Sequence, residues 1–154
     1  MGLKIPHEEP CPFCDYLSGL RPCAFVACED TASAFVNPTQ YERGGLLVVP
    51  NQHVSTILDA SSSDVADVAR LAQTLCRALD LAFDLTGLNV FQNNGQTSGQ
   101  QVPHYHVHIV PRHGPPETMK LFRAEGFPFL SVEQLEPVAV EIREALADLR
   151  SRAT

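Results

Sequence analysis

The stretch His104-Tyr105-His106-Val107-His108-Ile109-Val110 carries a histidine at every second position, with apolar residues between them. Successive side chains of a β-strand point to opposite faces, so this alternation predicts a strand with His104, His106 and His108 on one face. The apolar residues then pack on the other face. Histidine titrates near neutrality and can act as nucleophile, proton carrier, phosphate donor or metal ligand. A tag remnant would be terminal and lack the β-branched residues, so the row predicts a functional site.

The composition is that of one soluble domain. The 154 residues fit a single domain over residues 1–154, and 44% of them are hydrophobic, an ordinary share for a globular protein. The sequence has no apolar stretch of about 18 residues or more. The N-terminal segment, with His7, Glu8 and Glu9, lacks the basic start and apolar centre of a signal peptide. We therefore expect a cytoplasmic protein.

The chain is acidic, with a formal net charge of −7 and an isoelectric point near 5.2. Nucleic acids and anionic membranes are bound by lysine and arginine patches that replace counterions, so we expect neither partner. A small anionic ligand is compatible with this charge. Backbone N–H groups, protonated imidazole and Arg112 can hold a phosphate locally.

The chain has five cysteines. Two of them, Cys11 and Cys14, have the spacing of a zinc half-site or a redox pair, which in a cytoplasmic chain is favoured over a structural disulfide. Cys23, Cys28 and Cys76 have no such spacing. We expect these three to be small buried apolar residues.

The hydrophobic pattern predicts an α+β fold with an antiparallel sheet. The expected strands cover residues 23–27, 32–36, 44–50, 88–92 and 104–110. A long amphipathic helix is expected from Ser62 to about Thr86, stopped by Gly87. A second helix is expected over about 131–151, where Ser131 and Gln134 form a capping box. We expect both helices to pack against the sheet of a domain whose core covers about residues 11–112.

The histidine row resembles the motif of the histidine-triad (HIT) family, His-x-His-x-His followed by two apolar residues. The resemblance extends from about Cys11 to Arg112 and covers most of the chain. It includes Asn37, Leu47-Val48-Val49-Pro50, Asn93-Asn94-Gly95, Gly99-Gln100-Gln101-Val102 and Pro111-Arg112. It implies the α+β fold of that family and, since its members are often dimers, a homodimer.

Members of the family are nucleotide hydrolases and nucleotidyl transferases that act on dinucleoside polyphosphates or nucleotide phosphoramidates. The resemblance implies that His106 attacks the α-phosphorus and forms a nucleotidyl-histidine, which water then hydrolyses. A covalent intermediate of this kind divides one difficult displacement into two easier ones. The attacking nitrogen must be unprotonated, so we expect the other ring nitrogen to donate to a fixed acceptor such as a backbone carbonyl.

The resemblance assigns further roles around this nucleophile. His108 is the histidine that contacts the α-phosphate or assists the leaving group. Backbone N–H groups from Gly99 to Val102 hold the non-bridging oxygens. Gln100 or Gln101 reaches the leaving side, and Gln100 is placed with His106 and His108 among the catalytic residues.

Asn37 and Asn93 match family positions that contact the nucleoside and phosphate ends of the ligand. Asparagine is also common at strand ends and turns, where its hydrogen bonds are local. The chain departs from the family pattern on the phosphate side. Gly44-Gly45 stands where many members have glycine and histidine, and Gln101 stands where several have serine or threonine. These differences leave the preferred leaving group open.

A second resemblance, to a bacterial-type branch of the family, implies a structural zinc ion bound by Cys11, Cys14, His53 and His104. Two thiolates and two imidazoles form a closed tetrahedral set, which leaves no coordination position for substrate. Such an ion would brace the N-terminal segment against the sheet.

Three alternatives compete with a hydrolase that uses His106 as nucleophile. The triad histidines could all hold a catalytic zinc ion, which would leave Cys11 and Cys14 without a task. The chain could also be a regulatory module that binds nucleotide without turnover. Finally, it could be a transferase that passes the nucleotidyl group to phosphate.

Overall fold

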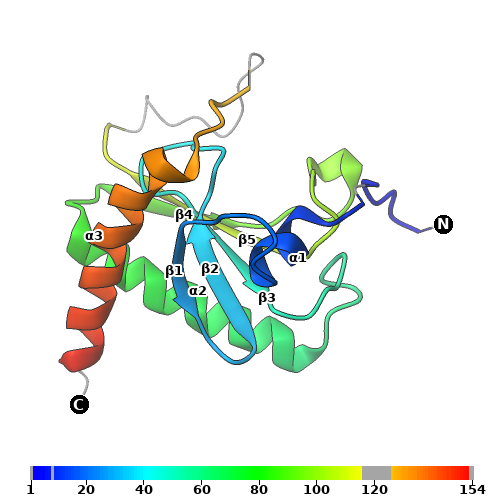
Figure 1. The fold of residues 1–154 in the computed structure, drawn as a ribbon, viewed down its shortest axis with the longest axis horizontal. Coiled ribbons are helices and arrows are strands. Elements are labelled where there is room, and N and C mark those ends of the chain that lie inside the picture. Colours follow the sequence, from blue (N-terminus) through cyan, green and yellow to red (C-terminus); the bar gives the residue numbers. More distant parts are fainter. Residues whose placement is uncertain (1, 8, 116–125, 153–154) are drawn as a thin grey trace.

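The computed structural model describes residues 2–7, 9–115 and 126–152 and contains one five-stranded antiparallel sheet (Figure 1). The strand order is β1-β2-β3-β5-β4. The strands are β1 (Phe25–Cys28), β2 (Ala32–Val36), β3 (Leu46–Pro50), β4 (Gly87–Phe91) and β5 (Val107–Arg112). The helices are α1 (Pro12–Leu17), α2 (Ser62–Ala82) and α3 (Val132–Ser151), with a short 3-10 turn η1 (Gln96–Ser98). This confirms the expected α+β fold.

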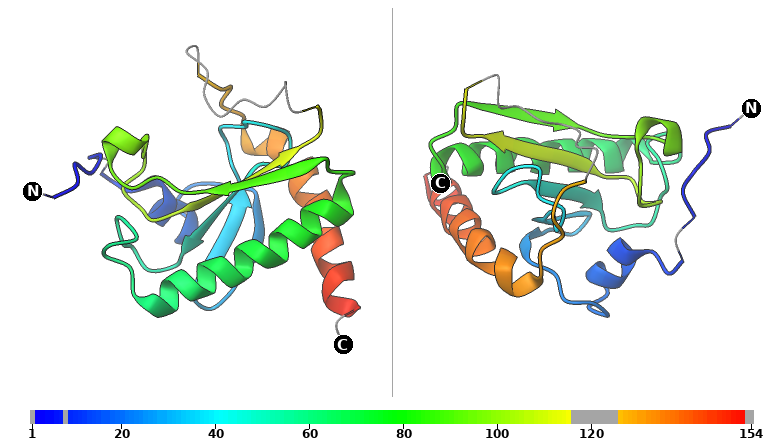
Figure 2. Two further views of the ribbon diagram at one scale, coloured as in Figure 1. Left: turned by 180° about the vertical axis from the view of Figure 1, so that it is seen from behind. Right: turned by 90° about the horizontal axis from the view of Figure 1, so that it is seen from above.

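The central strands β2 and β3 of the sheet are buried on both faces. The helix α2 lies along one face, and α3 packs on α2 and against β1 and β2 (Figure 2). Alternate residues of β2 and β3, such as Val36 and Val48, join the core under these helices. The residues between them, such as Phe35 and Leu47, join a smaller cluster with Phe13 of α1 on the opposite face. Burial on both faces explains why β3 is a continuous apolar run without alternation.

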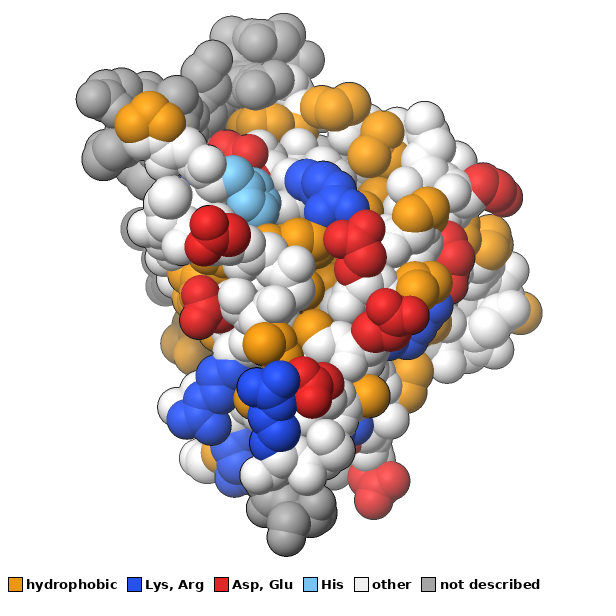
Figure 3. Space-filling view, turned by 90° about the vertical axis from the view of Figure 1, so that its left-hand side faces the viewer, with side chains coloured by type: hydrophobic (Ala, Val, Ile, Leu, Met, Phe, Trp, Pro, Cys, Tyr) orange, Lys and Arg blue, Asp and Glu red, His pale blue; other side chains and the backbone are white. Residues whose placement is uncertain are grey.

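The outer side of α3 is charged (Figure 3). Ion pairs link Arg143 to Glu136 and Arg150 to Glu29, each at 2.5 Å. Exposed pairs of this kind contribute about 1 kcal/mol or less. The fully buried Ile142 and Ala139 on the inner side of α3 therefore hold this helix against the core. None of the helices in the described ranges is long and apolar enough to cross a membrane.

The helix α2 begins where the pattern predicts but ends earlier. Ser61 and Asp64 form a capping box at its start. The expected end near Thr86 is wrong, because α2 ends at Ala82 and Phe83 is already extended, with φ −130° and ψ 138°. Gly87 does not stop the helix but begins β4, where it pairs with Arg112. The chain must turn between the end of α2 and the start of β4. The tertiary structure at Phe83 therefore overrides the helix that the spacing of apolar residues predicts there.

The histidine stretch is shifted relative to the expected strand. The ladder of β5 begins at Val107, since β3 pairs with it only from Leu46 to Val48, and it continues through Pro111 to Arg112. Pro111 is tolerated because it lies beyond the part of β5 that β3 pairs with, so no N–H is required on that side. Tyr105 lies before the start of β5 and is not part of the strand ladder. Its N–H donates to the Val54 carbonyl at 2.6 Å. The alternation of faces nevertheless holds, and Tyr105 is buried in the large core.

Candidate active site and metal-ligand cluster

A cavity of about 360 Å³ lies between α1, the loop after β2 and the start of β5. Cavities of this size accommodate small ligands. Its lining includes six of the residues expected at the site, namely Asn37, Gly99, Gln101, Val102, His106 and His108. The structure therefore brings both predicted catalytic histidines to one cavity.

The ring of His106 is fixed by a backbone hydrogen bond. Its Nδ1 lies 2.6 Å from the carbonyl oxygen of His104. A carbonyl can only accept, so Nδ1 carries the hydrogen and Nε2 keeps its lone pair. Burial lowers the pKa of His106, which favours the neutral ring. The ring also stands edge-on to Phe13, with centroids 5.3 Å apart. The acceptor is of the kind that the sequence argument expected.

His108 lies beside this ring, with centroids 4.9 Å apart. It stacks on Phe91 at 4.6 Å with an interplanar angle of 6°, and the ring of Tyr41 stands edge-on to it at 5.8 Å. Burial and the neighbouring His106 lower the pKa of His108 to about 3. Its Nδ1 is buried and has no hydrogen-bond partner within the described residues. His108 is therefore a neutral ring that is packed among aromatic side chains.

The two adjacent glutamines have different environments. Gln101 is exposed and lines the cavity. Gln100 is 3% exposed, and its amide accepts from Gly95 N at 2.6 Å and donates to Ser55 O at 2.7 Å and Val102 O at 3.0 Å. The amide of Gln100 thus braces the loop, whereas that of Gln101 faces the cavity.

The two asparagines also differ. Asn37 lines the cavity, and its Oδ1 accepts from the Thr39 N–H at 2.9 Å. Asn93 is not among the described residues that line the cavity. Its side-chain NH₂ group, in the orientation that satisfies the amide nitrogen and oxygen, donates to Gln92 O and Ser98 O, each at 3.2 Å. Asn37 is therefore positioned to meet a ligand, and Asn93 supports the loop before Gly99.

Glycine is required where this loop turns toward the cavity. Gly99 has φ +90°, in the left-handed region, and its N–H closes η1 by donating to Gln96 O at 2.9 Å. A side chain there would strain the backbone that carries Gln101 and Val102 into the cavity lining.

The sequence argument missed several residues that line the cavity. They are aromatic or basic and come from α1, the segment after it, the β2–β3 loop and the segment before α3: Phe13, Tyr16, Arg21, Tyr41 and Phe129. Pro12 at the first position of α1 was a usable signal for this helix, because proline favours that position. Arg112, considered for phosphate, instead donates from Nε to Asn89 Oδ1 at 2.8 Å and lies 3.6 Å from Glu42.

Beside the cavity, ligand atoms of Cys11, Cys14, His53 and His104 all lie within 4.8 Å of one another. The first turn of α1 brings the two cysteines to one side, as residues three apart in a helix are neighbours. His104 is fully buried and donates Nε2–H to Pro50 O at 2.9 Å, which leaves its Nδ1 for the cluster.

The spacing of this cluster fits a tetrahedral ion. Nδ1 of His104 is 3.6 Å from Sγ of Cys11 and 3.7 Å from Sγ of Cys14, and Nδ1 of His53 is 3.3 Å from Cys14. Zinc bonds of about 2.3 Å to sulfur and about 2.1 Å to nitrogen would place such atoms about 3.6 Å apart. Of the three triad histidines, the cluster found in the described residues includes only His104. This arrangement does not favour a catalytic zinc held by all three.

Comparison with known proteins gives consistent matches. A family model described as HIT domain matches residues 19–114. The Bacillus subtilis protein named Protein hit is 34% identical over 106 residues, covering 69% of this chain and 73% of that protein. The Schizosaccharomyces pombe protein named Adenosine 5'-monophosphoramidase hnt1 is 31% identical over 102 residues, covering 66% and 74%. A Zn-bound histidine triad family protein from Mycobacterium smegmatis has a TM-score of 0.80 at 27% identity, covering 93% of this chain and 97% of that one.

The loop geometry predicts that Gln100→Ala is destabilising. The substitution leaves the buried Gly95 N–H and two carbonyls without the partner that they have now, which costs about 1–3 kcal/mol of unfolding free energy. Gln101→Ala, at the exposed neighbour, should change it by about 0.5 kcal/mol or less. Urea denaturation of both variants measures the difference. Equal effects of the two would contradict the bracing role of Gln100.

Proposed function

Because the chain belongs to the HIT domain family, we propose that it is a nucleotide hydrolase that uses His106 as its nucleophile. The substrates would be nucleotide phosphoramidates or dinucleoside polyphosphates, cleaved at the α-phosphate. The observation that carries the proposal is the hydrogen bond from Nδ1 of His106 to His104 O, which leaves Nε2 unprotonated in a ligand-sized cavity. The relative named as an adenosine monophosphoramidase supports phosphoramidates as the first substrates to test.

In the proposed first step, Nε2 of His106 forms a bond to the α-phosphorus, and the bond from phosphorus to the leaving nitrogen or oxygen breaks. The leaving group takes that electron pair and a proton from water, and the N–H of neutral His108, whose ring lies 4.9 Å from that of His106, would donate a hydrogen bond to it. In the second step, water attacks phosphorus and loses a proton to bulk water, the phosphorus–nitrogen bond breaks, and His106 recovers its lone pair. The backbone N–H groups of Gly99 and Gln100 already donate to Gln96 O and Gly95 O, so those of Gln101 and Val102, with the Gln101 amide, would hold the non-bridging oxygens. Such a donor contributes about 3–4 kcal/mol.

We expect His106→Ala to lower kcat/KM for adenosine 5′-phosphoramidate by at least about a thousandfold, since no other group supplies the nucleophile. Rapid-quench mass spectrometry of the wild type should show a nucleotidyl adduct on His106. His113→Ala is the control, because His113 is exposed, lies outside the cavity lining, and contacts the Arg43 carbonyl at 3.0 Å and the Phe83 ring. Equal rates for wild type and His106→Ala would remove the assignment.

The same assay separates the alternative functions. Saturable nucleotide binding with neither adduct nor turnover would indicate a regulatory binding module. Release of a nucleoside diphosphate that depends on added phosphate would indicate a transferase. Turnover with an adduct and without any need for phosphate supports the hydrolase.

We further propose that the cluster of Cys11, Cys14, His53 and His104 binds a structural zinc ion. The chemistry of the donors and their spacing fit zinc, and the Zn-bound relative has the same fold. When bound, the ion would cross-link α1, the chain after β3 and the start of the histidine stretch. Four protein ligands leave it no open position, so no step of the reaction passes through it.

Cys14→Ser should remove about one equivalent of zinc and lower the unfolding free energy by on the order of several kcal/mol, because metal binding is coupled to folding. Cys28→Ser is the matched control, since Cys28 is exposed and lies outside the cluster. Elemental analysis and thermal denaturation measure both effects. A wild-type protein prepared with zinc present that retains no metal would contradict the proposal, as would a Cys14→Ser variant with full zinc content.

We propose that the chain acts as a homodimer in the cytoplasm. Its cysteines form no disulfide, as expected in a reducing compartment.

The edge strand β4 exposes Leu88 at 37% and Val90 at 53%, and α2 forms a wall of an apolar cavity of about 320 Å³ beside Val90. Exposed apolar surface on a sheet edge is typical of an interaction site.

Val90→Lys should shift the dimer to monomer at micromolar concentration, because burying an unpaired ammonium in the interface is unfavourable. Light scattering after size-exclusion chromatography measures the mass. Val140→Lys, at a similarly exposed position on α3, should leave the mass unchanged. A wild type that is monomeric at all concentrations excludes the dimer.

A further inference from the structure

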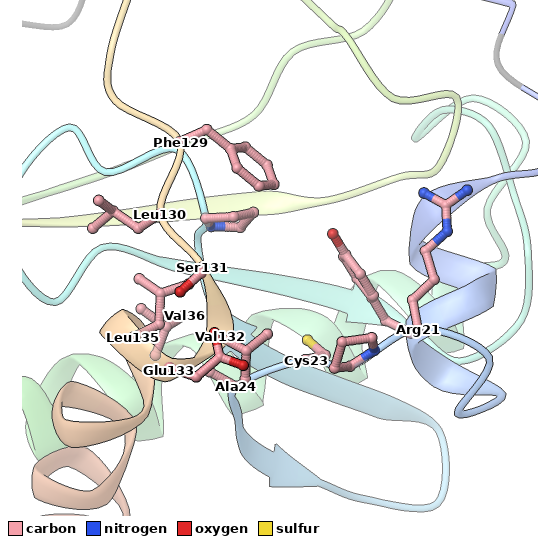
Figure 4. Close-up of a pocket in the computed structure, with 13 residues that line it drawn as sticks. Arg21, Cys23, Ala24, Val36, Phe129, Leu130, Ser131, Val132, Glu133 and Leu135 are labelled. Carbon is pink, nitrogen blue, oxygen red and sulfur yellow. The ribbon is translucent and has the colours of Figure 1, made fainter.

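Figure 4 shows the lining of a second cavity, also of about 360 Å³. This cavity shares part of its lining with the cavity of His106. It lies between the segment after α1, the end of β2 and the start of α3. Four residues line both cavities, namely Tyr16, Arg21, Pro38 and Phe129. The two spaces are therefore separated by a shared wall of single side chains.

The second cavity is mainly apolar inside. Its walls include Cys23, Ala24, Val36, Val132 and Leu135. Burial raises the pKa of the Cys23 thiol to about 12, so this sulfur is an uncharged part of the wall. The charged side chains of the lining, Arg21 and Glu133, are exposed and belong to the rim. A group that enters this cavity is therefore stabilised by apolar contact.

Phe129 stands at the boundary of the two cavities. Its backbone is held by a β-bridge to Thr39, and the next residue donates its N–H to Pro38 O at 2.9 Å. Phe129 is nevertheless 72% exposed to solvent. In Figure 4 the ring extends over the cavity toward the side on which Arg21 lies. A large aromatic ring held in this position gains contact area when an apolar group lies against it.

The contacts of the catalytic rings indicate which end of a substrate reaches this wall. The ring centroid of Phe13 lies 5.3 Å from that of His106 and 6.2 Å from that of Tyr16. Tyr16 belongs to the shared wall, so the ring of Phe13 connects this wall to the proposed nucleophile. His108, which serves the leaving group in the proposed mechanism, has a different set of ring neighbours, Phe91 and Tyr41. Asn37, the candidate contact for the nucleoside, directly precedes Pro38 of the shared wall.

We propose that the second cavity extends the substrate site and binds an apolar group carried by the base of the nucleotide. The inference rests on the proposed function, because it takes the phosphate to lie at His106 and the nucleoside to point toward Tyr16 and Phe129. The substrate class is a nucleotide whose base bears an aryl or alkyl substituent. Such a group lies against Phe129 and fills the space in front of Val132 and Leu135.

The test compares adenosine 5′-phosphoramidate with its derivatives that carry a benzyl group at N6 or at C2. The wild type should prefer one of the benzyl derivatives by at least about tenfold in kcat/KM. Val132 lines the second cavity and not the first, so Val132→Trp should fill the second cavity and reduce that preference to near parity. Val140→Trp, on α3 outside both cavities, should retain it. Cys23→Phe blocks the cavity from the opposite wall and serves if Val132→Trp fails to fold.

Binding of the corresponding monophosphates, measured by calorimetry, keeps the two proposals distinguishable. If the wild type turns over no phosphoramidate but binds a benzylated monophosphate at least about tenfold more tightly than AMP, the function fails and the subsite stands. If it hydrolyses the unsubstituted compound, shows no preference for either benzyl derivative and binds their monophosphates no more tightly, the subsite is excluded. A preference that Val132→Trp and Cys23→Phe both leave intact also excludes it.

Discussion

The hydrogen bond from Nδ1 of His106 to the carbonyl of His104 is the contact on which the site depends. It selects the tautomer of His106, the proposed nucleophile, and holds its ring in the cavity. The acceptor residue is itself immobilised, because the His104 side chain donates to Pro50 O and turns its other nitrogen toward the two sulfurs of the cluster. One residue thus belongs to both centres. A metal ion in the cluster would steady the nucleophile through the backbone of its acceptor, without approaching the reacting phosphorus.

Burial keeps both histidines of this site uncharged, so the positive charge in the described lining of the cavity is that of Arg21. The pKa of His108 falls to about 3, so the ring is neutral at physiological pH. Negative charge on a bound phosphate would then be met by the N–H groups of Gln101 and Val102 and by Arg21, which forms an ion pair with Asp15 at 2.9 Å. The same burial has a consequence for folding. The folded pKa is below the unfolded value near 6.5, so the contribution of His108 to stability is complete above about pH 6.5 and is lost as the pH falls toward about 3.

The sequence predicted most of the sheet and the faces of the histidines, because both follow from local alternation. The start of β5 did not follow, since it depends on where β3 stops pairing, at Val48. Likewise the end of α2 depends on the tertiary position of Phe83, which helical spacing does not encode. The two glutamines show the limit most clearly. Gln100 and Gln101 are identical in chemistry, and only the left-handed turn at Gly99 and the partners at Ser55 and Gly95 decide which amide faces the cavity.

The aromatic residues of the site were missed because they come from separate segments that only the fold brings together. Phe13 and Tyr16 belong to a helix of six residues, and Phe129 follows the last strand and is linked to the segment after β2 by a β-bridge to Thr39. Their placement gives the combined cavity two unlike ends. At one end, imidazoles and backbone N–H groups suit a phosphate, and at the other, apolar walls suit a group that water solvates poorly. A ligand with one charged and one apolar end is favoured in a single orientation there, since the reverse orientation would bury its charge against apolar walls without a partner.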